Sequence, residues 1–159
     1  MEVTILIEGM GLFFEIYQKI DKAYRRYFQA KLAEYGFTPN EIVVILFLYN
    51  NAPGLDTATD IAIRKGMSKG MIARSVDSLC EKNYLEAVRD KKDRRIVHLA
   101  LKNEHSQIAE EIERTQKDFF DQLVGDIPRN DLDLVRDTLT KLLTNSEIFL
   151  DTRRNHHAE

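Results

Sequence analysis

The sequence predicts a mainly α-helical fold that contains one small β-hairpin. Apolar residues recur at helical spacing over most of the 159 residues. Two short helical segments meet at a glycine between Thr57 and Lys82, and two strand-like runs joined by a basic loop follow them directly. Together these observations indicate a winged helix-turn-helix lobe, accompanied by a second lobe made of the N- and C-terminal helices.

The length and composition are those of an ordinary globular protein. Apolar residues make up 43% of the chain and charged residues 31%, and the chain is long enough to bury a sizeable core. No run reaches the roughly 20 apolar residues of a membrane span, and the first residues lack the basic start of a signal peptide. We therefore expect a cytoplasmic protein with no membrane partner.

Cys80 is the single cysteine of the chain, so an internal disulfide is excluded and a reducing compartment is expected. It lies near the end of a predicted helix, beside core positions. We expect a small, buried, hydrophobic side chain there, and a redox sensor is the alternative.

The first predicted helix runs from about Glu8 to Ala33 and carries an aromatic stripe. The residues at steps of three and four are Phe13, Tyr17, Ile20, Tyr24, Tyr27 and Lys31, with Phe14 and Phe28 beside them. One interpretation places this stripe in the core and in a subunit contact. The other makes part of it an aromatic wall for a small ligand, and the candidate pocket residues are then Phe14, Tyr24 and Phe47.

The run Thr38-Pro39-Asn40-Glu41 predicts the start of a second helix. A threonine followed three residues later by a glutamate forms a capping box, and proline suits the first helical position. The helix that follows, to about Tyr49, is almost wholly apolar, so we expect it at the centre of the fold. Proline and glycine in the segment Asn50–Gly54 end it.

The segment between Thr57 and Lys82 predicts the helix-turn-helix. Thr57 and Asp60 match a capping box, Gly66 suits a left-handed helix end, and Ser68 can cap the next helix. In that helix the positions expected to face the core are Met71, Ile72, Ser75, Val76 and Leu79. The outward face begins with small and basic residues, which suits the major groove of double-stranded DNA. The candidate DNA contacts on this face are Ser68, Lys69, Gly70, Ala73 and Arg74.

The strand-like runs Tyr84–Arg89 and Ile96–Leu101 predict a hairpin, the wing of a winged helix. The loop between them carries four cations and two acids, and the candidate DNA contacts in it are Lys91, Lys92, Asp93, Arg94 and Arg95. An arginine suits the narrow, negative minor groove, and Asp93 can brace Arg95 from two residues away. Alternatively the cations only keep the hairpin soluble, an interpretation that fits Lys91 and Lys92 best.

The charge is distributed unevenly, although the whole chain is acidic with a net charge of −3. Residues 54–102 contain eleven Lys and Arg against seven Asp and Glu, a balance of +4, so the remaining residues carry −7. A basic segment in an otherwise acidic chain is typical of a DNA-binding protein. Residues 54–102 are called the reading segment below.

The wing and the helix before it resemble the MarR family of winged-helix transcription regulators. Asp93-Arg94-Arg95, five further residues and Leu101 are similar to the family's D-x-R-x5-L-T wing signature. Gly66-Met67-Ser68-Lys69 is similar to the start of the family's recognition helix, and Gly36-Phe37-Thr38-Pro39 resembles the usual approach to its second helix.

Two residues depart from the family pattern: Lys65 stands at a usually apolar position, and Lys102 replaces the signature threonine. The resemblance implies a dimeric repressor, with each recognition helix in a major groove of an inverted-repeat operator and each wing in the flanking minor groove. The two helices must then lie about one turn of DNA apart, roughly 34 Å. The resemblance also implies a small phenolic or lipophilic effector, bound between the dimer helices and the reading lobe.

The chain after the wing predicts two more helices. Asn103 can cap a helix that runs to about Val124, and Gly125-Asp126-Ile127-Pro128 separates it from the next. Apolar seams at both chain ends are expected to pair in a two-fold dimer, and the candidate interface residues are Phe13, Tyr17, Leu132, Val135, Leu139, Leu142 and Phe149. Residues 1–35 and 103–159 are therefore predicted to form a helical dimerisation region, and residues 36–102 the DNA-binding region.

The sequence carries no motif for catalysis or for a cofactor. It has no Gly-rich phosphate loop, no H-E-x-x-H and no G-x-S-x-G, so we expect neither an enzyme nor a cofactor. A zinc site would use Glu104, His105 and a residue of the first predicted helix, although we expect no metal. The alternative to a DNA-binding regulator is a helical dimerisation or protein-interaction module without sequence-specific DNA binding.

Overall fold

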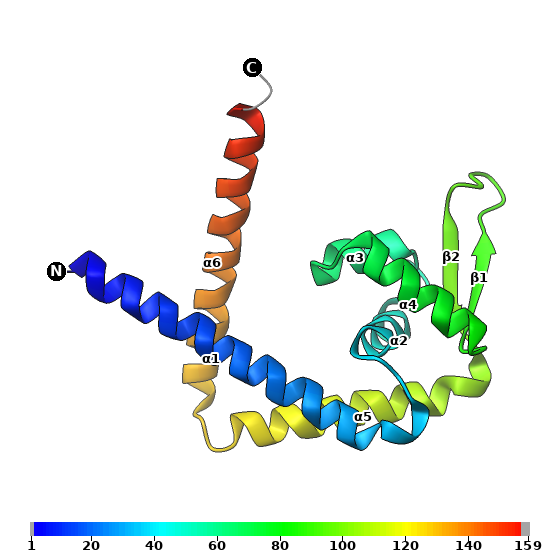
Figure 1. The fold of residues 1–159 in the computed structure, drawn as a ribbon, viewed down its shortest axis with the longest axis horizontal. Coiled ribbons are helices and arrows are strands. Elements are labelled where there is room, and N and C mark those ends of the chain that lie inside the picture. The colour runs from blue at the N-terminus through cyan, green and yellow to red at the C-terminus, as the bar shows by residue number, and fades with distance from the viewer. Residues whose placement is uncertain (1, 157–159) are drawn as a thin grey trace. The chain divides into compact units, whose positions relative to one another are not determined.

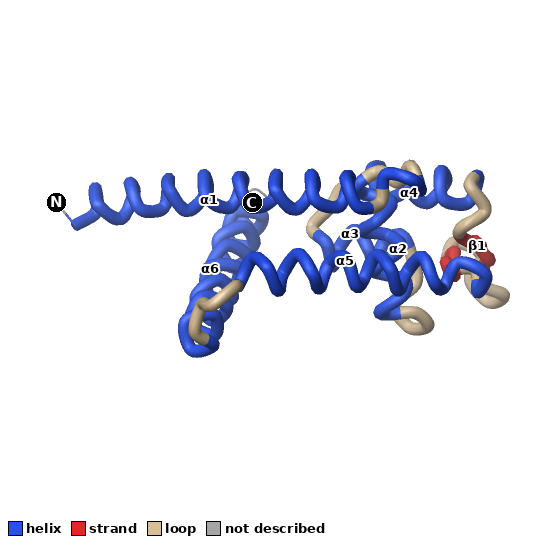
Figure 2. The backbone as a smooth tube through the Cα atoms, turned by 90° about the horizontal axis from the view of Figure 1, so that it is seen from below, coloured by secondary structure: helices blue, strands red, loops and turns tan. Residues whose placement is uncertain are grey.

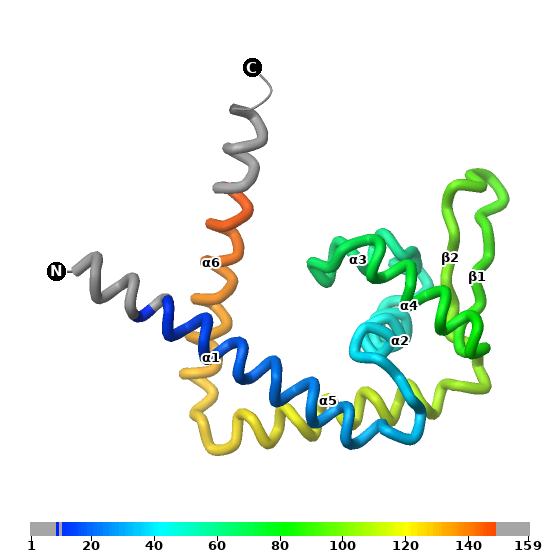
Figure 3. Tube along the Cα trace, viewed as in Figure 1, coloured from blue at the N-terminus to red at the C-terminus, as the bar shows by residue number. Residues whose placement is uncertain are grey.

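The computed structural model describes the backbone of residues 2–156 and the side chains of residues 9 and 11–148 (Figure 3). The helices and strands, in chain order, are α1 (Glu2–Lys31), α2 (Pro39–Asn51), α3 (Ala58–Lys65), α4 (Lys69–Glu81), β1 (Leu85–Arg89), β2 (Val97–Leu101), α5 (Ser106–Val124) and α6 (Arg129–His156) (Figure 1). Helices dominate (Figure 2), and the two strands form one antiparallel hairpin. The predicted fold class is confirmed. The chain divides into two compact units, residues 1–120 and 121–159.

The first helix is longer at its start than the sequence indicated, because it begins at Glu2 instead of Glu8. Gly9 and Gly11 lie inside it. A glycine in a helix interior costs only about 1 kcal/mol relative to alanine, which the rest of a 30-residue helix readily offsets. After α1, a short 3-10 turn (Ala33–Tyr35) ends at Gly36, whose φ of 60° is left-handed.

The second helix is the centre of the core, as predicted. Its capping box is complete: the Thr38 hydroxyl accepts a hydrogen bond from the backbone N–H of Glu41, and the Glu41 carboxylate accepts one from the N–H of Thr38. Its buried residues are Glu41, Ile42, Val44, Ile45, Leu46, Phe47 and Leu48. With both flanks covered, α2 is the element against which α4 and β2 pack.

The helix-turn-helix forms at the predicted residues. Asp60 completes the capping box of Thr57, Gly66 ends α3 with a φ of 62°, and Ser68 caps α4 by accepting a hydrogen bond from the N–H of Met71. Four of the five predicted core positions of α4 are buried: Ile72, Ser75, Val76 and Leu79. The prediction is wrong for Met71, which is 37% exposed. It lies in the first turn of α4, where it lines two cavities instead of the core.

The wing is a two-stranded hairpin, and each strand is one residue shorter at its start than expected. The register pairs Leu85 with Leu101 and Arg89 with Val97. Leu85 and Leu99 are buried, and the N–H of Leu99 donates to the carbonyl of Asp56 at 2.7 Å. That bond ties the hairpin to the segment before α3.

A buried carboxylate joins the start of α2 to the end of α4. The side chain of Glu41 is 1% exposed, and its Oε1 accepts hydrogen bonds from Lys82 Nζ and Ser78 Oγ, both at 2.8 Å. Burial raises the pKa of Glu41, but the donors Lys82, Thr38 and Ser78 outweigh it and hold the pKa below its ordinary value. The carboxylate is therefore ionised and fully bonded at neutral pH.

The helix after the wing starts later than predicted. Asn103 does not cap it, because Asn103–His105 form a 3-10 turn and α5 begins at Ser106. The α5 face against the core contains Ala109, Ile112, Thr115 and Phe119. Phe119 packs on Tyr24 and Tyr27 of α1, with ring centroids 5.2 and 5.5 Å apart, so part of the aromatic stripe is core.

We predict that Glu41→Gln lowers the free energy of unfolding by about 2 kcal/mol at pH 7, because the amide loses the charge-assisted bonds to Lys82 and Ser78 while it can still cap α2. Asp60→Asn is the matched control, since it changes the same box on α3 without a long-range partner, and less than 1 kcal/mol is expected. Urea unfolding measures both.

The Glu41 contribution should also depend on pH. The folded pKa is lowered, so the stabilisation is present above the ordinary Glu value of about 4.3 and is lost as the pH falls through the lowered value. Equal losses for the two variants, or a difference independent of pH, would contradict the role assigned to Glu41.

Candidate nucleic-acid interface

The outward face of α4 has the character that the sequence predicted for a DNA-reading helix. The five candidate contacts Ser68, Lys69, Gly70, Ala73 and Arg74 are all exposed. Gly70 has open space around it, and Lys69 and Arg74 make no ion pair with any other residue in the described part of the chain. The N-terminal half of α4 therefore offers small residues and two uncommitted cations to a partner.

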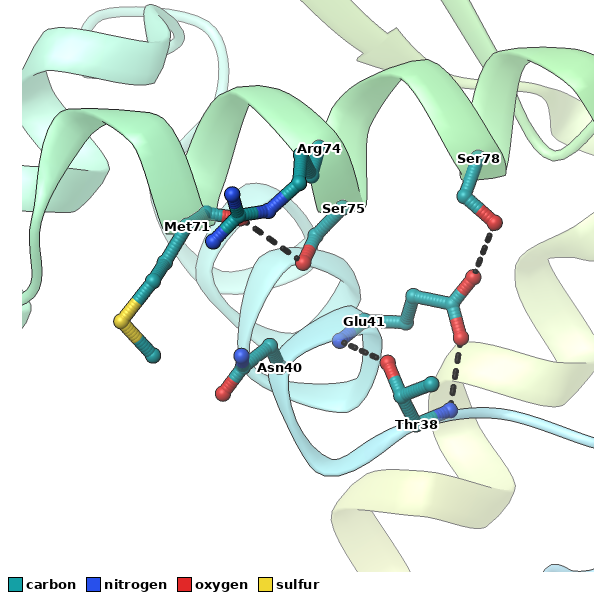
Figure 4. A pocket seen from close by; sticks show the side chains of 7 residues that line it. All are labelled: Thr38, Asn40, Glu41, Met71, Arg74, Ser75 and Ser78. Carbon is teal, nitrogen blue, oxygen red and sulfur yellow. Dashed lines mark hydrogen bonds between the residues drawn. The ribbon is translucent and has the colours of Figure 1, made fainter.

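A groove lies beside Arg74, between α4 and the start of α2 (Figure 4). Its volume is about 380 Å³, and its lining residues are Thr38, Asn40, Glu41, Met71, Arg74, Ser75 and Ser78. Ser75 turns its hydroxyl back to the carbonyl of Met71 at 3.1 Å, and Ser78 bonds to Glu41. The guanidinium of Arg74 has no bonded partner among these side chains, so it is free to reorient toward a ligand.

The loop of the wing is held by two aspartates. Asp90 Oδ1 accepts hydrogen bonds from the backbone N–H groups of Lys92 and Asp93, both at 2.7 Å. Asp93 accepts bonds from Arg95 through the backbone N–H at 3.0 Å, Nε at 3.0 Å and Nη2 at 2.9 Å. The brace that the sequence suggested for Arg95 is thus present as a two-pronged ion pair.

The bracing leaves the arginine accessible. The Arg95 side chain is 91% exposed although Asp93 grips one edge of it. The hydrogen bonds from Arg95 lower the pKa of Asp93, and the N–H groups of Asp93 and Lys92 lower that of Asp90. Both acids are therefore ionised at neutral pH, and the loop presents an oriented cation.

One contact at the loop end of the wing strands was not anticipated from the sequence. His98 was expected to be a plain strand-surface residue, yet its Nδ1 lies 2.8 Å from Asp56 Oδ1 and its Nε2 lies 3.4 Å from Asp90 Oδ2. Asp56 and Asp90 are far apart in sequence and carry no shared motif. The register of the hairpin brings Asp90 to His98, and the hydrogen bond from the N–H of Leu99 to the carbonyl of Asp56 brings Asp56 to it.

Of the three candidate pocket residues, Tyr24 lines a cavity. This cavity of about 370 Å³ is bounded by Tyr24, Asp21 and Arg25 of α1, the first turn of α2, and the α3–α4 turn with Lys65 and Met67. Phe14 is 58% exposed on α1 and Phe47 lies in the core of α2. Lys65 places its ammonium 5.9 Å from the centre of the Phe47 ring, which accounts for a cation at this usually apolar position.

The candidate dimer residues are mostly solvent-exposed in the isolated chain. Tyr17 on α1 and Val135, Leu139 and Leu142 on α6 are exposed, whereas Phe13 and Leu132 are half-buried. The side chain of Phe149 lies outside the described residues. Further exposed apolar residues on the same two helices are Leu12, Ile16, Leu134, Leu143 and Ile148.

The remaining chemical candidates are His105 and Cys80. Among the described side chains, no group of three or more His, Cys, Asp or Glu has an arrangement that could hold a metal ion. The His105 ring lies tilted against the Tyr84 ring, with centroids 4.3 Å apart, and His105 Nε2 lies 3.5 Å from Glu104 Oε1. Burial raises the pKa of Cys80, and the charge of Asp77 raises it further, which keeps the thiol protonated. No helix in residues 2–156 has both the length and the apolarity that crossing a membrane requires.

Comparison with known folds finds the same architecture in solved structures. The S. aureus MepR–DNA complex has a TM-score of 0.77 and 17% identity, over 84% of this chain and 97% of that one. Bordetella bronchiseptica BpsR, whose DNA binding is regulated by 6-hydroxynicotinic acid, has a TM-score of 0.69 and 16% identity, over 82% and 98%. CouR from Rhodococcus jostii RHA1 bound to p-coumaroyl-CoA has a TM-score of 0.69 and 19% identity, over 80% and 88%.

Sequence comparison finds a family similarity in the central part of the chain. No curated protein matches the sequence. Residues 35–96, which span α2, the helix-turn-helix and the wing loop, match the family model described as MarR family. The wing signature, the capped recognition helix and the winged-helix fold agree with that match. Residues 35–96 are thus similar to the MarR family, and the solved structures show that the chain has the fold of these regulators.

Proposed function

We propose that this protein is a repressor that binds double-stranded DNA sequence-specifically, as a homodimer on an inverted-repeat operator. The observation that carries the proposal is the pairing of two features in one lobe: the exposed, small and basic start of α4, and a wing arginine that Asp93 orients outward. In this arrangement α4 enters a major groove and Arg95 enters the flanking minor groove.

The contacts divide by the kind of readout. Arg74 is long and unpaired, so it can reach a base edge, whereas Ser68 and Gly70 allow the start of α4 to approach the DNA backbone closely. Four other cations form no ion pair among the described residues and suit phosphate contacts: Lys69, Lys91, Lys92 and Arg94. Arg95 is pre-oriented, so less side-chain entropy is lost when it binds.

The exposed apolar residues of α1 and α6 support a dimer. A large apolar side chain left in water forfeits roughly 1.5–3 kcal/mol relative to burial, and these two helices carry many such side chains. We assign residues 1–35 and 103–159 to a helical dimerisation region and residues 36–102 to the DNA-binding region. A two-fold interface would place two copies of α4 about 34 Å apart, as an inverted repeat requires.

We further propose that a small aromatic anion binds the cavity beside Tyr24 and weakens DNA binding. Asp21 and Arg25 form an ion pair with each other at 2.8 Å, which leaves Lys65 as the unpaired charge at the cavity and favours an anionic ligand. The cavity touches the α3–α4 turn, so a ligand there can bias the placement of α4. It must bind the non-operator arrangement more tightly, since equal affinity for both arrangements shifts nothing.

The competing function is a helical dimerisation or protein-interaction module that does not read DNA. It predicts no salt-dependent binding to duplex DNA, because no phosphate contacts would form. The basic reading segment and the unpaired Arg74 favour the regulator.

The wing prediction concerns Arg95. Arg95→Ala should weaken operator binding by about 1–3 kcal/mol with the dimer intact, because one pre-oriented groove contact is lost. Asp93→Ala should cost less, since it only releases the arginine. Lys91→Ala is the matched control. It should weaken binding equally for all DNA sequences, and it should lower the slope of log affinity against log salt concentration by about one. Fluorescence anisotropy with a labelled operator measures all three, and Arg74→Ala tested beside them distinguishes base contact from phosphate contact. If Arg95→Ala bound the operator as tightly as the wild type, Arg95 would not contact the minor groove.

The dimer prediction concerns α6. Leu139→Asp combined with Leu142→Asp places charges in the apolar seam, so the dimer should dissociate and operator affinity should fall to that of one half-site. Lys141→Asp changes the charge of the same helix outside that seam and should leave the dimer intact. Sedimentation equilibrium at micromolar concentration decides between these outcomes. A stable dimer of the double variant that still binds the full operator would place the interface elsewhere.

The effector prediction uses the absence of tryptophan from the chain. Tyr24→Trp places a single fluorophore on the cavity, and salicylate should change its emission with a saturable curve while it lowers operator affinity. Phe14→Trp, on the exposed part of α1, is the control and should not respond. If salicylate changed the emission of Phe14→Trp but not that of Tyr24→Trp, the effector site would lie outside this cavity.

A further inference from the structure

We propose that His98 is a positioning residue that holds the wing ready for DNA only while its imidazole is protonated, so that operator binding weakens when the proton is lost. The inference rests on the proposed contact of the wing with DNA and adds a regulating proton to it. His98 touches no predicted DNA contact directly, and it acts through the loop that carries Arg95.

The geometry of the histidine favours the charged form. Nδ1 lies 2.8 Å from Asp56 Oδ1, and Nε2 lies 3.4 Å from Asp90 Oδ2. A neutral imidazole has one N–H and one lone pair, so one of the two carboxylates would face a lone pair and be repelled. Only the imidazolium donates toward both acids.

The two acids link different parts of the lobe. Asp56 precedes α3, and its backbone carbonyl accepts the N–H of Leu99 on β2. Asp90 follows β1, and its second oxygen, Oδ1, holds the N–H groups of Lys92 and Asp93. The protonated histidine therefore ties the loop end of β2 to the segment before α3 on one side and steadies the turn of the wing loop on the other.

The path from His98 to the DNA contact is short. Asp90 fixes the backbone of Asp93, and the side chain of Asp93 grips Arg95 through two guanidinium nitrogens. When His98 loses its proton, Asp90 loses an electrostatic partner on one side of its carboxylate. The loop then becomes less ordered, and Arg95 is less well oriented for the minor groove.

The surroundings of His98 favour its charged form. The groups facing it are Asp56 from the segment before α3 and Asp90 from the wing, and on β1 it pairs with the uncharged Val88, with Glu86 two positions away on the same face. The hydrogen bond to Asp56 raises the pKa of His98, burial opposes it, and the charges of Asp56 and Asp90 add to the increase. Neither acid is paired with a Lys or Arg in the described part of the chain.

A metal does not explain this cluster. The two nitrogens on opposite sides of one ring face different carboxylates, so the three groups do not converge on a single point. The clamp is a proton-dependent contact.

The sign of the pH effect follows from the raised pKa. The clamp is complete below the ordinary histidine value of about 6.5 and is lost as the pH rises through the raised value. Operator affinity, measured at constant salt from pH 6 to pH 9, should fall by about threefold to tenfold in the wild-type protein, the range for a partly lost charge-assisted bond.

Four full-length variants test the clamp. His98→Gln should bind weakly at every pH, and Asp56→Asn should move the midpoint to lower pH because it removes the main cause of the raised pKa. His105→Gln is the control for a histidine outside the clamp and should retain the wild-type profile. Titration of the His98 ring by NMR, without DNA, reports its protonation directly and should give a midpoint above 6.5.

The fourth variant, Arg95→Ala, distinguishes an indirect role from a direct phosphate contact of His98. If His98 acts through the wing arginine, Arg95→Ala should bind weakly and with little pH dependence. A full wild-type pH profile in either His98→Gln or Arg95→Ala would overturn the positioning role. Arg95→Ala that binds as tightly as the wild type at all pH values would remove the proposed wing contact itself, and this inference with it.

Discussion

The placement of α4 depends on its packing against α2, and one buried carboxylate fixes that packing. The apolar residues of α2 and α4 supply most of the favourable free energy, but hydrophobic contact has little directional preference. Glu41 adds direction, because its oxygens must meet Lys82, Ser78 and the N–H of Thr38 at hydrogen-bond distance. A rotation or slide of α4 would break these bonds and leave an unpaired charge in the interior, which is costly. The reading face is therefore held in one orientation.

In the wing too, apolar burial holds the element in place and ionised side chains fix its arrangement through hydrogen bonds. A hairpin of two five-residue strands has too little core to order its own loop. Leu85 and Leu99 anchor its base by burial, and the aspartates at 90 and 93 order the loop by hydrogen bonds. The charges that would interact with DNA thus start from a defined arrangement, and a proton on His98 becomes part of that arrangement. In α4 and the wing, a few ionised side chains thus fix the positions of elements that are held together by buried apolar residues.

Local rules predicted the elements well and long-range contacts poorly. The capping boxes at Thr38 and Thr57, the left-handed Gly66 and the Ser68 cap depend on residues within four positions, so the sequence sufficed for them. The brace of Arg95 by Asp93 is equally local. The bonds of Glu41 span about 40 residues and those of His98 to Asp56 span 42, and only the folded chain brings these residues together. Met71 was assigned to the core because it falls at helical spacing with the buried residues of α4. That spacing does not show that the first turn of α4 borders two cavities instead of the core.

The central claim is that two copies of the α4 and wing pair read one operator. The most direct measurement is a selection of duplexes bound by the full-length protein from random DNA, followed by sequencing. The bound duplexes should contain an inverted repeat whose half-site centres lie about one helical turn, roughly 34 Å, apart, with preferred bases in the flanking minor grooves. Enrichment of a single unrepeated half-site, or no enrichment over the starting pool, would contradict it.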